Sequence, residues 1–199
     1  MIWPCIPVLV EPSMQGTAYG IMTSFQNAGQ FIVPLALQQV YKNYQSYVPC
    51  EGFFIASSVL SHYAPANVQS AWLPRVASGE ALVVLAQQER KARYRLDVCE
   101  AKAAPAQDGY ALTAIKSVVA AGDKADAFIV PAQLDGKIAL FLVERTATGV
   151  TTQGYVTQDG SRAAEVKFTN APATLITTDG LAALELGVDI GIAATCAEA

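Results

Sequence analysis

Short runs of apolar and β-branched residues recur about every ten positions from residue 81 onward. The runs span residues 81–87, 95–101, 109–113, 127–133, 137–144, 150–156 and 164–169. Turn-forming residues separate them, and Asp135-Gly136 between two runs is the typical link of a two-residue β-hairpin. Seven short strands with regular turns predict an all-β sandwich or barrel.

Helical patterns flank this β region on both sides. Residues 67–72 form a short helical run before it, and Pro74 is expected to end that helix. After Gly180, apolar residues return at helical spacing. They are Leu181, Leu184, Val188, Ile192 and Cys196. Because this stripe reaches the last residue without a C-cap, the chain is predicted to stop inside a helix, as a truncated one would.

The first 63 residues differ in composition from the rest of the chain. Only three of the 30 charged residues, Glu11, Lys42 and Glu51, lie there. Such a break indicates two segments with different surroundings, and we predict an α+β protein in four parts. These are an apolar helical segment (residues 1–63), a helix and connection (64–80), a β-domain (81–178) and a C-terminal helix (179–199).

Membrane insertion of the first segment is open on length alone, since roughly 20 apolar residues span a bilayer as a helix. Gly16 and Gly20 also have the spacing that lets two membrane helices approach closely. Against insertion, the uncharged run contains amide and hydroxyl side chains that are costly in lipid, and prolines that break or kink helices. An apolar helical hairpin without a function of its own is the alternative.

The charge balance and the reactive residue types exclude several functions. A net charge of −4 and a pI near 5.0 argue against nucleic acid as a partner, because phosphate binding needs a clustered positive field. The four cysteines show no Cys-x-x-Cys spacing, which favours reduced thiols and a cytoplasmic protein; membrane association through residues 1–63 is the alternative. With His62 as the single histidine, we expect no His-rich metal site.

Several stretches after Ala66 follow one another in a recognisable order. They are Trp72-Leu73-Pro74-Arg75-Val76-Ala77-Ser78-Gly79-Glu80, then Glu89, then Gly109-Tyr110-Ala111-Leu112-Thr113-Ala114-Ile115-Lys116, then Phe141-Leu142-Val143 and Asp159-Gly160-Ser161-Arg162. They keep this order and spacing within the roughly 130 residues from Ala66 to the end of the chain. The ordered set resembles the central β-domain of flavin-dependent acyl-CoA dehydrogenases, and Glu89 takes the place of the glutamate in that family's flavin loop.

The resemblance implies FAD as the cofactor and an acyl-CoA as the substrate. In this register the loop Gln87-Gln88-Glu89 lines the flavin, with Gln88 at the family's Thr or Ser. Val118 stands where many members have a ring-packing Trp, and Ala120 where they have a Thr. Tyr94, at the Ser of a Ser-Asp pair, is expected to contact the substrate. For the two glutamines, polar residues that merely end a strand are the alternative.

Two basic residues stand out in the same register. Lys116 and Arg162 are each either a surface charge or ion pair, or a contact to the cofactor. Arg162 follows the turn formed by residues 159–161, where an N–H-rich bend and a guanidinium together suit a ribityl or phosphate oxygen.

No catalytic residue is assigned. The family's catalytic base lies in a C-terminal helical domain of which this chain has only the first helix, and Asp189 and Glu198 do not match that base. Losing a general base costs about 10²–10⁴-fold in rate. We therefore expect no turnover, and weak or absent binding of FAD. A homo-oligomer is among the assemblies that the resemblance allows.

The first segment has a resemblance of its own. Residues 2–4, 16–24, 26–29 and 52–56 are similar to late transmembrane helices of major facilitator superfamily transporters. The alternatives to an incomplete dehydrogenase are therefore a transporter fragment fused to an incidental β-domain, a ligand-free structural domain, or a chimeric chain. On this interpretation, a chain that begins at Ala66 is expected to be more soluble than the whole.

Overall fold

A computed structural model describes residues 14–21, 23–24, 48–92, 95–107, 109–158 and 160–198. The chain divides into two compact units, Met1–Gln39 and Val40–Ala199. In the first unit, residues 15–21 and 23–24 are helical. The hydroxyl groups of Thr23 and Ser24 donate to the carbonyl oxygens of Tyr19 and Gly20, at 2.7 and 2.9 Å. These bonds satisfy two polar side chains within the helix itself.

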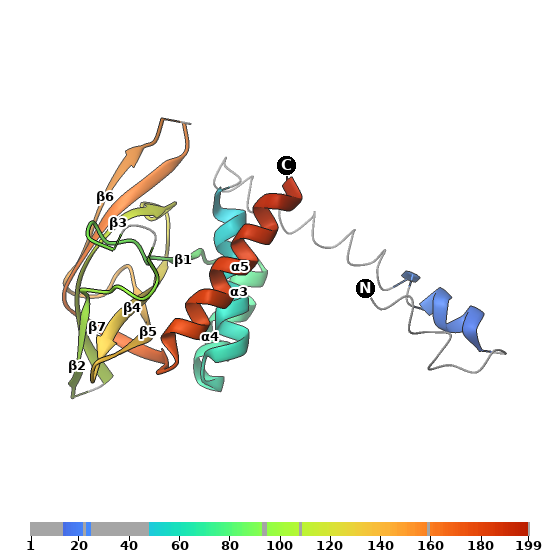
Figure 1. Ribbon diagram of the computed structural model, residues 1–199, viewed down its shortest axis with the longest axis horizontal. Helices are drawn as coiled ribbons and strands as arrows, with labels where there is room; N and C mark the ends of the chain where they lie inside the picture. The colour runs from blue at the N-terminus through green and yellow to red at the C-terminus, as the bar shows by residue number, and fades with distance from the viewer. Residues whose placement is uncertain are drawn as a thin grey trace. The chain divides into compact units, whose positions relative to one another are not determined.

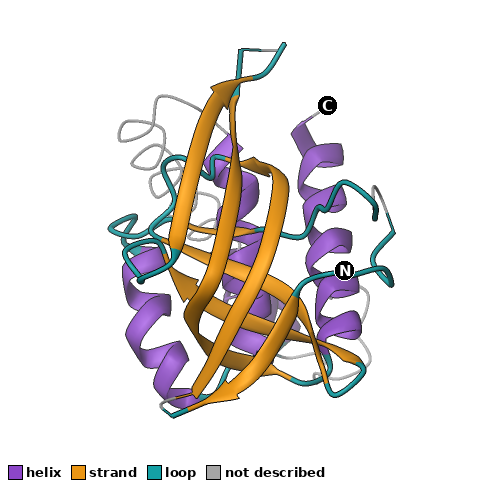
Figure 2. Cartoon of the chain, turned by 90° about the vertical axis from the view of Figure 1, so that its left-hand side faces the viewer, coloured by secondary structure: helices purple, strands orange, loops and turns teal. Residues whose placement is uncertain are grey.

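Seven strands of the second unit form one sheet that closes into a barrel (Figure 2). They are β1 (Val83–Leu85), β2 (Lys102–Ala106), β3 (Gly109–Ala120), β4 (Ala127–Leu134), β5 (Lys137–Glu144), β6 (Val150–Val156) and β7 (Arg162–Thr177). The order β4-β2-β3-β7-β5 returns to β4, while β1 adds to β4 and β6 adds to β7. The barrel predicted for this region is confirmed.

One predicted strand is wrong and two are longer than expected. Residues 95–101 form no strand; β2 starts at Lys102 instead. The amides of Glu100 and Ala101 donate to the carboxylate of Glu89, so they are not available to a neighbouring strand. Strands β3 and β7 extend past the predicted ends, and register shifts within their pairing break the two-residue alternation that the sequence pattern relied on.

Three helices cover one side of the barrel (Figures 1 and 2). They are α3 (Val48–Tyr63), α4 (Ala66–Ala77) and α5 (Gly180–Glu198). The prediction that Pro74 ends a helix is wrong, because α4 continues to Ala77. Burial of Trp72 and Val76 on one face favours the extra turn, and the N–H of Ser78 closes it by donating to the carbonyl of Pro74 at 2.9 Å.

The C-terminal helix is confirmed, but its buried face differs from the predicted stripe. Leu181 and Ile192 are exposed, whereas Ala183, Leu184 and Gly187 are buried. A Cβ atom at Gly187 would lie 3.2 Å from a side-chain carbon of Val59 on α3. Small residues therefore set this face, because they let α5 approach α3 closely.

An inner cluster of apolar residues fills the barrel. Its members include Leu112, Phe128, Val130, Phe141 and Phe168. Phe128 and Phe168 meet edge to face with ring centroids 5.7 Å apart. Strand β4 is buried on both faces, which explains why the sequence there is a continuous apolar run rather than an alternating one.

An outer cluster lies between the sheet and the helices. Its members include Val59 and Leu60 of α3, Trp72 of α4, Ile129 and Leu140 of the sheet, and Leu184 of α5. Helix α3 therefore shares a core with the barrel, although the sequence placed residues up to 63 in a separate segment. No helix in the described ranges is both long and apolar enough to cross a membrane.

Candidate functional site

A pocket of about 420 Å³ lies between the barrel and the helices. We call it the helix-side pocket. It is lined by Ile55, Leu85, Gln87, Gln88, Val118, Val119, Ala120, Val188, Gly191 and Ile192. Gln87, Gln88, Val118 and Ala120, which are predicted to contact the cofactor, are among them, and Glu89 of the same predicted loop is not. Two segments that are 30 residues apart in the sequence thus meet at one site.

A bulge in β3 brings Val118 into the pocket. The pairing with β7 shifts register between Lys116 and Val119, and Val118 has a φ of 51°. A β-branched residue in this region of backbone space is strained. The shift leaves the side chain of Val118 about half exposed, while those of Lys116 and Val119 face the interior. Local strain and an exposed apolar side chain therefore coincide at the pocket wall.

Gln87 brings an unsatisfied polar atom to the same wall. Its Oε1 is buried and accepts no hydrogen bond from the residues that the structure describes. The Oγ of Ser117, next to Val118, is in the same condition. A buried polar atom without a partner costs roughly 1–3 kcal/mol. Such atoms are expected where a ligand supplies the missing bond, so both mark this region as a candidate binding site.

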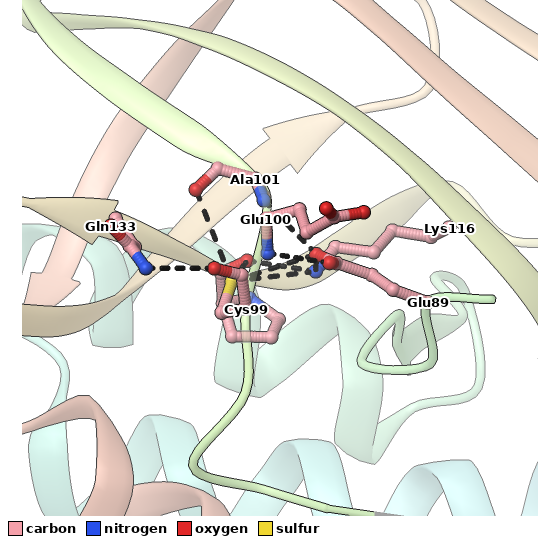
Figure 3. Close-up of polar contacts among 7 residues, drawn as sticks. Glu89, Cys99, Glu100, Ala101, Lys116 and Gln133 are labelled. Atoms are coloured by element: carbon pink, nitrogen blue, oxygen red, sulfur yellow. Dashed lines mark hydrogen bonds and ion pairs between the residues drawn. The ribbon is translucent and has the colours of Figure 1, made fainter. Parts of the chain in front are cut away.

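A buried ion pair joins Glu89, the residue after the wall residue Gln88, to Lys116 of β3 (Figure 3). The Nζ atom of Lys116 donates to Oε1 of Glu89 at 2.6 Å, and the two side chains are 0% and 4% exposed. Lys116 also donates to the carbonyl of Pro131 on β4, at 2.9 Å. The carboxylate accepts from the amides of Glu100 at 2.6 Å and Ala101 at 3.1 Å. Every polar atom of the pair is thus engaged by the protein.

The surroundings of Glu89 keep it ionised. Burial alone raises the pKa of its carboxyl, but the hydrogen bond and charge of Lys116, with the amides of Glu100 and Ala101, outweigh burial and lower the pKa below its ordinary value. The neighbouring Cys99 behaves differently. Burial raises the pKa of its thiol to about 11 despite the charge of Lys116, so this cysteine is no nucleophile near neutral pH.

Sequence reasoning did not settle the pairing of Lys116, although a signal was present. Alternation along β3 places Leu112 and Ala114 inside the barrel, and Lys116 is the next residue of the same face. A buried lysine needs a charged partner. The partner, Glu89, is 27 residues away, and its identity could not be read from that pattern.

Tyr94, the predicted substrate contact, is outside the described residues. Arg162 is not among the residues that line the helix-side pocket. Arg162 donates from Nε to the carboxylate of Asp123 at 2.5 Å, so its guanidinium is engaged in an ion pair. Three basic residues of the loop that follows β1 form ion pairs near the surface. These are Arg90–Glu165, Lys91–Glu100 and Arg95–Asp97.

A second cavity, of about 860 Å³, lies over the face of β3, β6 and β7. Its lining is rich in hydroxyl and charged side chains. These include Thr113, Thr151, Thr152, Thr169, Glu165 and Lys167. Glu89 of the predicted flavin loop lines it, whereas Gln87, Gln88, Val118 and Ala120 do not. It is the larger of the two, and apolar atoms make up most of the exposed lining of both cavities, so the positions of the predicted cofactor residues, and not polarity, favour the helix-side pocket.

Comparison with known proteins identifies the fold of the barrel. No protein-family model matches the chain. Acyl-CoA dehydrogenase FadE27 of Mycobacterium tuberculosis (strain ATCC 25618 / H37Rv) is 29% identical over 107 residues, which are 54% of this chain and 27% of that protein. This similarity is limited to a part of each protein.

Solved structures agree with this match. Glutaryl-CoA dehydrogenase from Mycobacterium smegmatis in complex with FADH2 superposes with a TM-score of 0.64 at 21% identity, over 71% of this chain and 38% of that one. The ChsE4-ChsE5 complex from Mycobacterium tuberculosis gives 0.60 at 26%, over 70% and 37%. The β-domain therefore has an acyl-CoA dehydrogenase-like fold, and the chain spans less than two fifths of these structures. The transporter resemblance, the chimeric origin and membrane association find no support.

Proposed function

We propose that the helix-side pocket holds the isoalloxazine ring of a flavin, and that the chemistry to which this chain contributes is acyl-CoA dehydrogenation. One observation carries the proposal: four residues that the resemblance assigns to the flavin come from two separate segments and line one pocket. They are Gln87, Gln88, Val118 and Ala120. If Gln87 and Gln88 were only polar residues at the end of a strand, they would not be expected to line a cavity together with Val118 and Ala120.

The pocket suits a flavin ring in size and chemistry. Its volume of about 420 Å³ lies within the range of roughly 300–1,000 Å³ that is usual for small-ligand sites. Eight of its ten lining residues are apolar or glycine, as an aromatic ring system requires. The amide of Gln87, whose oxygen has no partner among the described residues, can turn toward the N–H of the ring edge and satisfy both groups.

The described lining of the pocket contains no titratable side chain. When bound, a flavin accepts the hydride that this reaction removes, but the reaction also needs a base for the α-proton. We therefore propose that this chain binds the ring without catalysing turnover. An acyl-CoA substrate, its contact with Tyr94, a homo-oligomeric assembly and a cytoplasmic location remain predictions for the whole protein.

Titration of the purified chain with riboflavin, FMN and FAD, followed by flavin fluorescence, tests the proposal. If the site holds the ring alone, the three ligands should bind with similar dissociation constants. Each constant should be weaker than about 1 μM, which corresponds to a binding free energy of about −8 kcal/mol. Affinity that rises steeply from riboflavin to FAD would contradict a ring-only site. Absence of binding at millimolar flavin would contradict the proposal as a whole.

A blocking variant locates the site. Ala120→Trp fills the pocket from the exposed end of β3 and is expected to abolish binding. Ala104→Trp is the matched control, because Ala104 is also an exposed strand alanine and lies outside the pocket lining. If both variants bind flavin as the natural chain does, the ligand sits elsewhere.

A further inference from the structure

The geometry points to the Glu89–Lys116 ion pair as the device that positions the two walls of the helix-side pocket, and so sets its affinity for the flavin ring. This inference rests on the proposed function. Glu89 directly follows the wall residues Gln87 and Gln88, and Lys116 lies two residues before Val118. The pair therefore joins the two wall segments at the point where each enters the pocket.

The sheet itself does not hold these walls together. β1, which leads into Gln87, pairs with β4, whereas β3, which carries Val118, pairs with β2 and β7. The residues before the wall are fixed to β4, since the amide of Ala86 donates to Ile129 at 2.9 Å. In the described part of the loop between β1 and β2, one main-chain bond crosses to β3: the N–H of Ser117 donates to the carbonyl of Gln88 at 2.8 Å.

The ion pair supplies the second connection. Its short bond of 2.6 Å joins Glu89 to β3, and the further bonds of Lys116 to Pro131 and of Glu89 to Glu100 and Ala101 tie the pair to β4 and to the start of β2. Four separate segments thus converge on one carboxylate and one ammonium group. A displacement of either partner would shift Gln88 relative to Val118.

An apolar replacement of the Glu89–Lys116 pair distinguishes a role in positioning the pocket walls from a role in stabilising the fold. A buried ion pair is often no more stabilising than apolar side chains of similar volume, because both charges lose their hydration. Glu89→Leu combined with Lys116→Met fills the space without burying a charge. If the pair served stability alone, this double variant would leave the pocket unchanged. A positioning role predicts that the fold persists and the walls loosen.

The test compares full-length E89L/K116M with the natural chain by two independent measurements. In amide hydrogen exchange, the Ser117 amide is expected to exchange at least 10-fold faster in the variant, while the Ala86 amide is unchanged. In fluorescence titration, riboflavin is expected to bind at least 5-fold more weakly. Lys91→Gln, which removes an exposed ion pair of the same loop, is the control and should alter neither value.

Each outcome is decisive. A folded double variant with unchanged Ser117 exchange, or with faster exchange but unchanged riboflavin affinity, overturns the inference. If the natural chain binds no flavin, the proposed function fails, and exchange at Ser117 still decides whether the pair positions the walls. If the double variant does not fold, E89Q/K116M, which retains an oxygen acceptor for the Ala101 amide, replaces it in both measurements, with the same outcomes.

Discussion

The barrel sheet separates two apolar clusters that are built in different ways. All residues of the inner cluster come from one stretch, residues 82–173. The outer cluster draws on three stretches, residues 56–83, 127–142 and 176–184. Leu112 of the inner cluster and Leu60 of the outer one are both completely buried. The two sides of the sheet are thus equally well packed, but only the outer side depends on all three helices.

This difference bears on the candidate site. The helix-side pocket lies on the outer side and takes Ile55 from α3, and Val188, Gly191 and Ile192 from α5. The barrel alone supplies the polar wall and the strained Val118, while the helices supply the apolar cover. The outer layer is therefore a condition for the pocket and not an accessory to it.

Removal of α3 is expected to have the largest effect. A chain that begins at Ala66 loses Val59 and Leu60, whose burial is worth roughly 3–6 kcal/mol of a typical total of about 5–15 kcal/mol. We expect it to aggregate, the reverse of the gain in solubility that the sequence indicated. A chain that begins at Val48 retains α3 and should unfold cooperatively. The soluble fraction and the urea unfolding curve are measured for both shortened chains. A soluble and stably folded chain that begins at Ala66 would contradict the shared outer core.

Lys116→Met alone tests the ion pair at the border of the inner cluster. It leaves the carboxylate of Glu89 buried without its cation, and loss of one partner from a buried pair costs about 3–5 kcal/mol in the free energy of unfolding. The double variant E89L/K116M should recover most of this loss. Equal destabilisation of the single and double variants would show that lost packing, and not an unpaired charge, is the cause.

Matched leucines compare the two clusters directly. Leu60→Ala and Leu112→Ala should each lower the free energy of unfolding by about 2–5 kcal/mol, because each leaves a cavity in a fully buried site. Urea denaturation measures both changes, and the slope of the free energy of unfolding against urea concentration should stay the same in each variant. If Leu60→Ala lowered the free energy of unfolding by less than about 0.5 kcal/mol, as surface substitutions usually do, while Leu112→Ala had the full effect, α3 would not be part of the core.

Acid should weaken the natural chain more than E89L/K116M. The pKa of Glu89 is lowered from its ordinary 4.5, so the carboxylate stabilises the fold fully above pH 4.5 and this contribution is lost as pH falls through the lower, folded-state pKa. The double variant lacks it. Urea unfolding at pH 7, at pH 4.5 and near pH 3 measures the difference, and identical pH dependence of both chains would show that Glu89 has an ordinary pKa.

The smallest effect concerns the ring itself. Val118→Trp adds an aromatic surface to the pocket wall, and aromatic stacking is worth about 0.5–1.5 kcal/mol beyond buried area. Riboflavin should therefore bind about 2- to 10-fold more tightly. Weaker binding would mean that Val118 does not face the ring.

The sequence predicted the inner side of the molecule better than the outer side. Strand alternation and turn residues located most of the barrel, because both are local. The role of α3 was not predictable in that way, since an apolar helix that packs on a sheet and one that lies in lipid have similar compositions. Of the candidate site, the resemblance named four of the ten residues that line the pocket. The pairing of Glu89 with Lys116 depends on the closed sheet, so it could not be predicted from the sequence.

Amide chemical-shift mapping with lumiflavin, the flavin ring without its side chain, tests the central claim most directly. The two cavities give opposite predictions. A ring bound in the helix-side pocket would give saturable shifts concentrated at Gln87, Gln88, Val118 and Ala120, with changes along the facing part of α5. Shifts confined to Thr113, Thr151, Thr169 and the other residues of the larger cavity would contradict it.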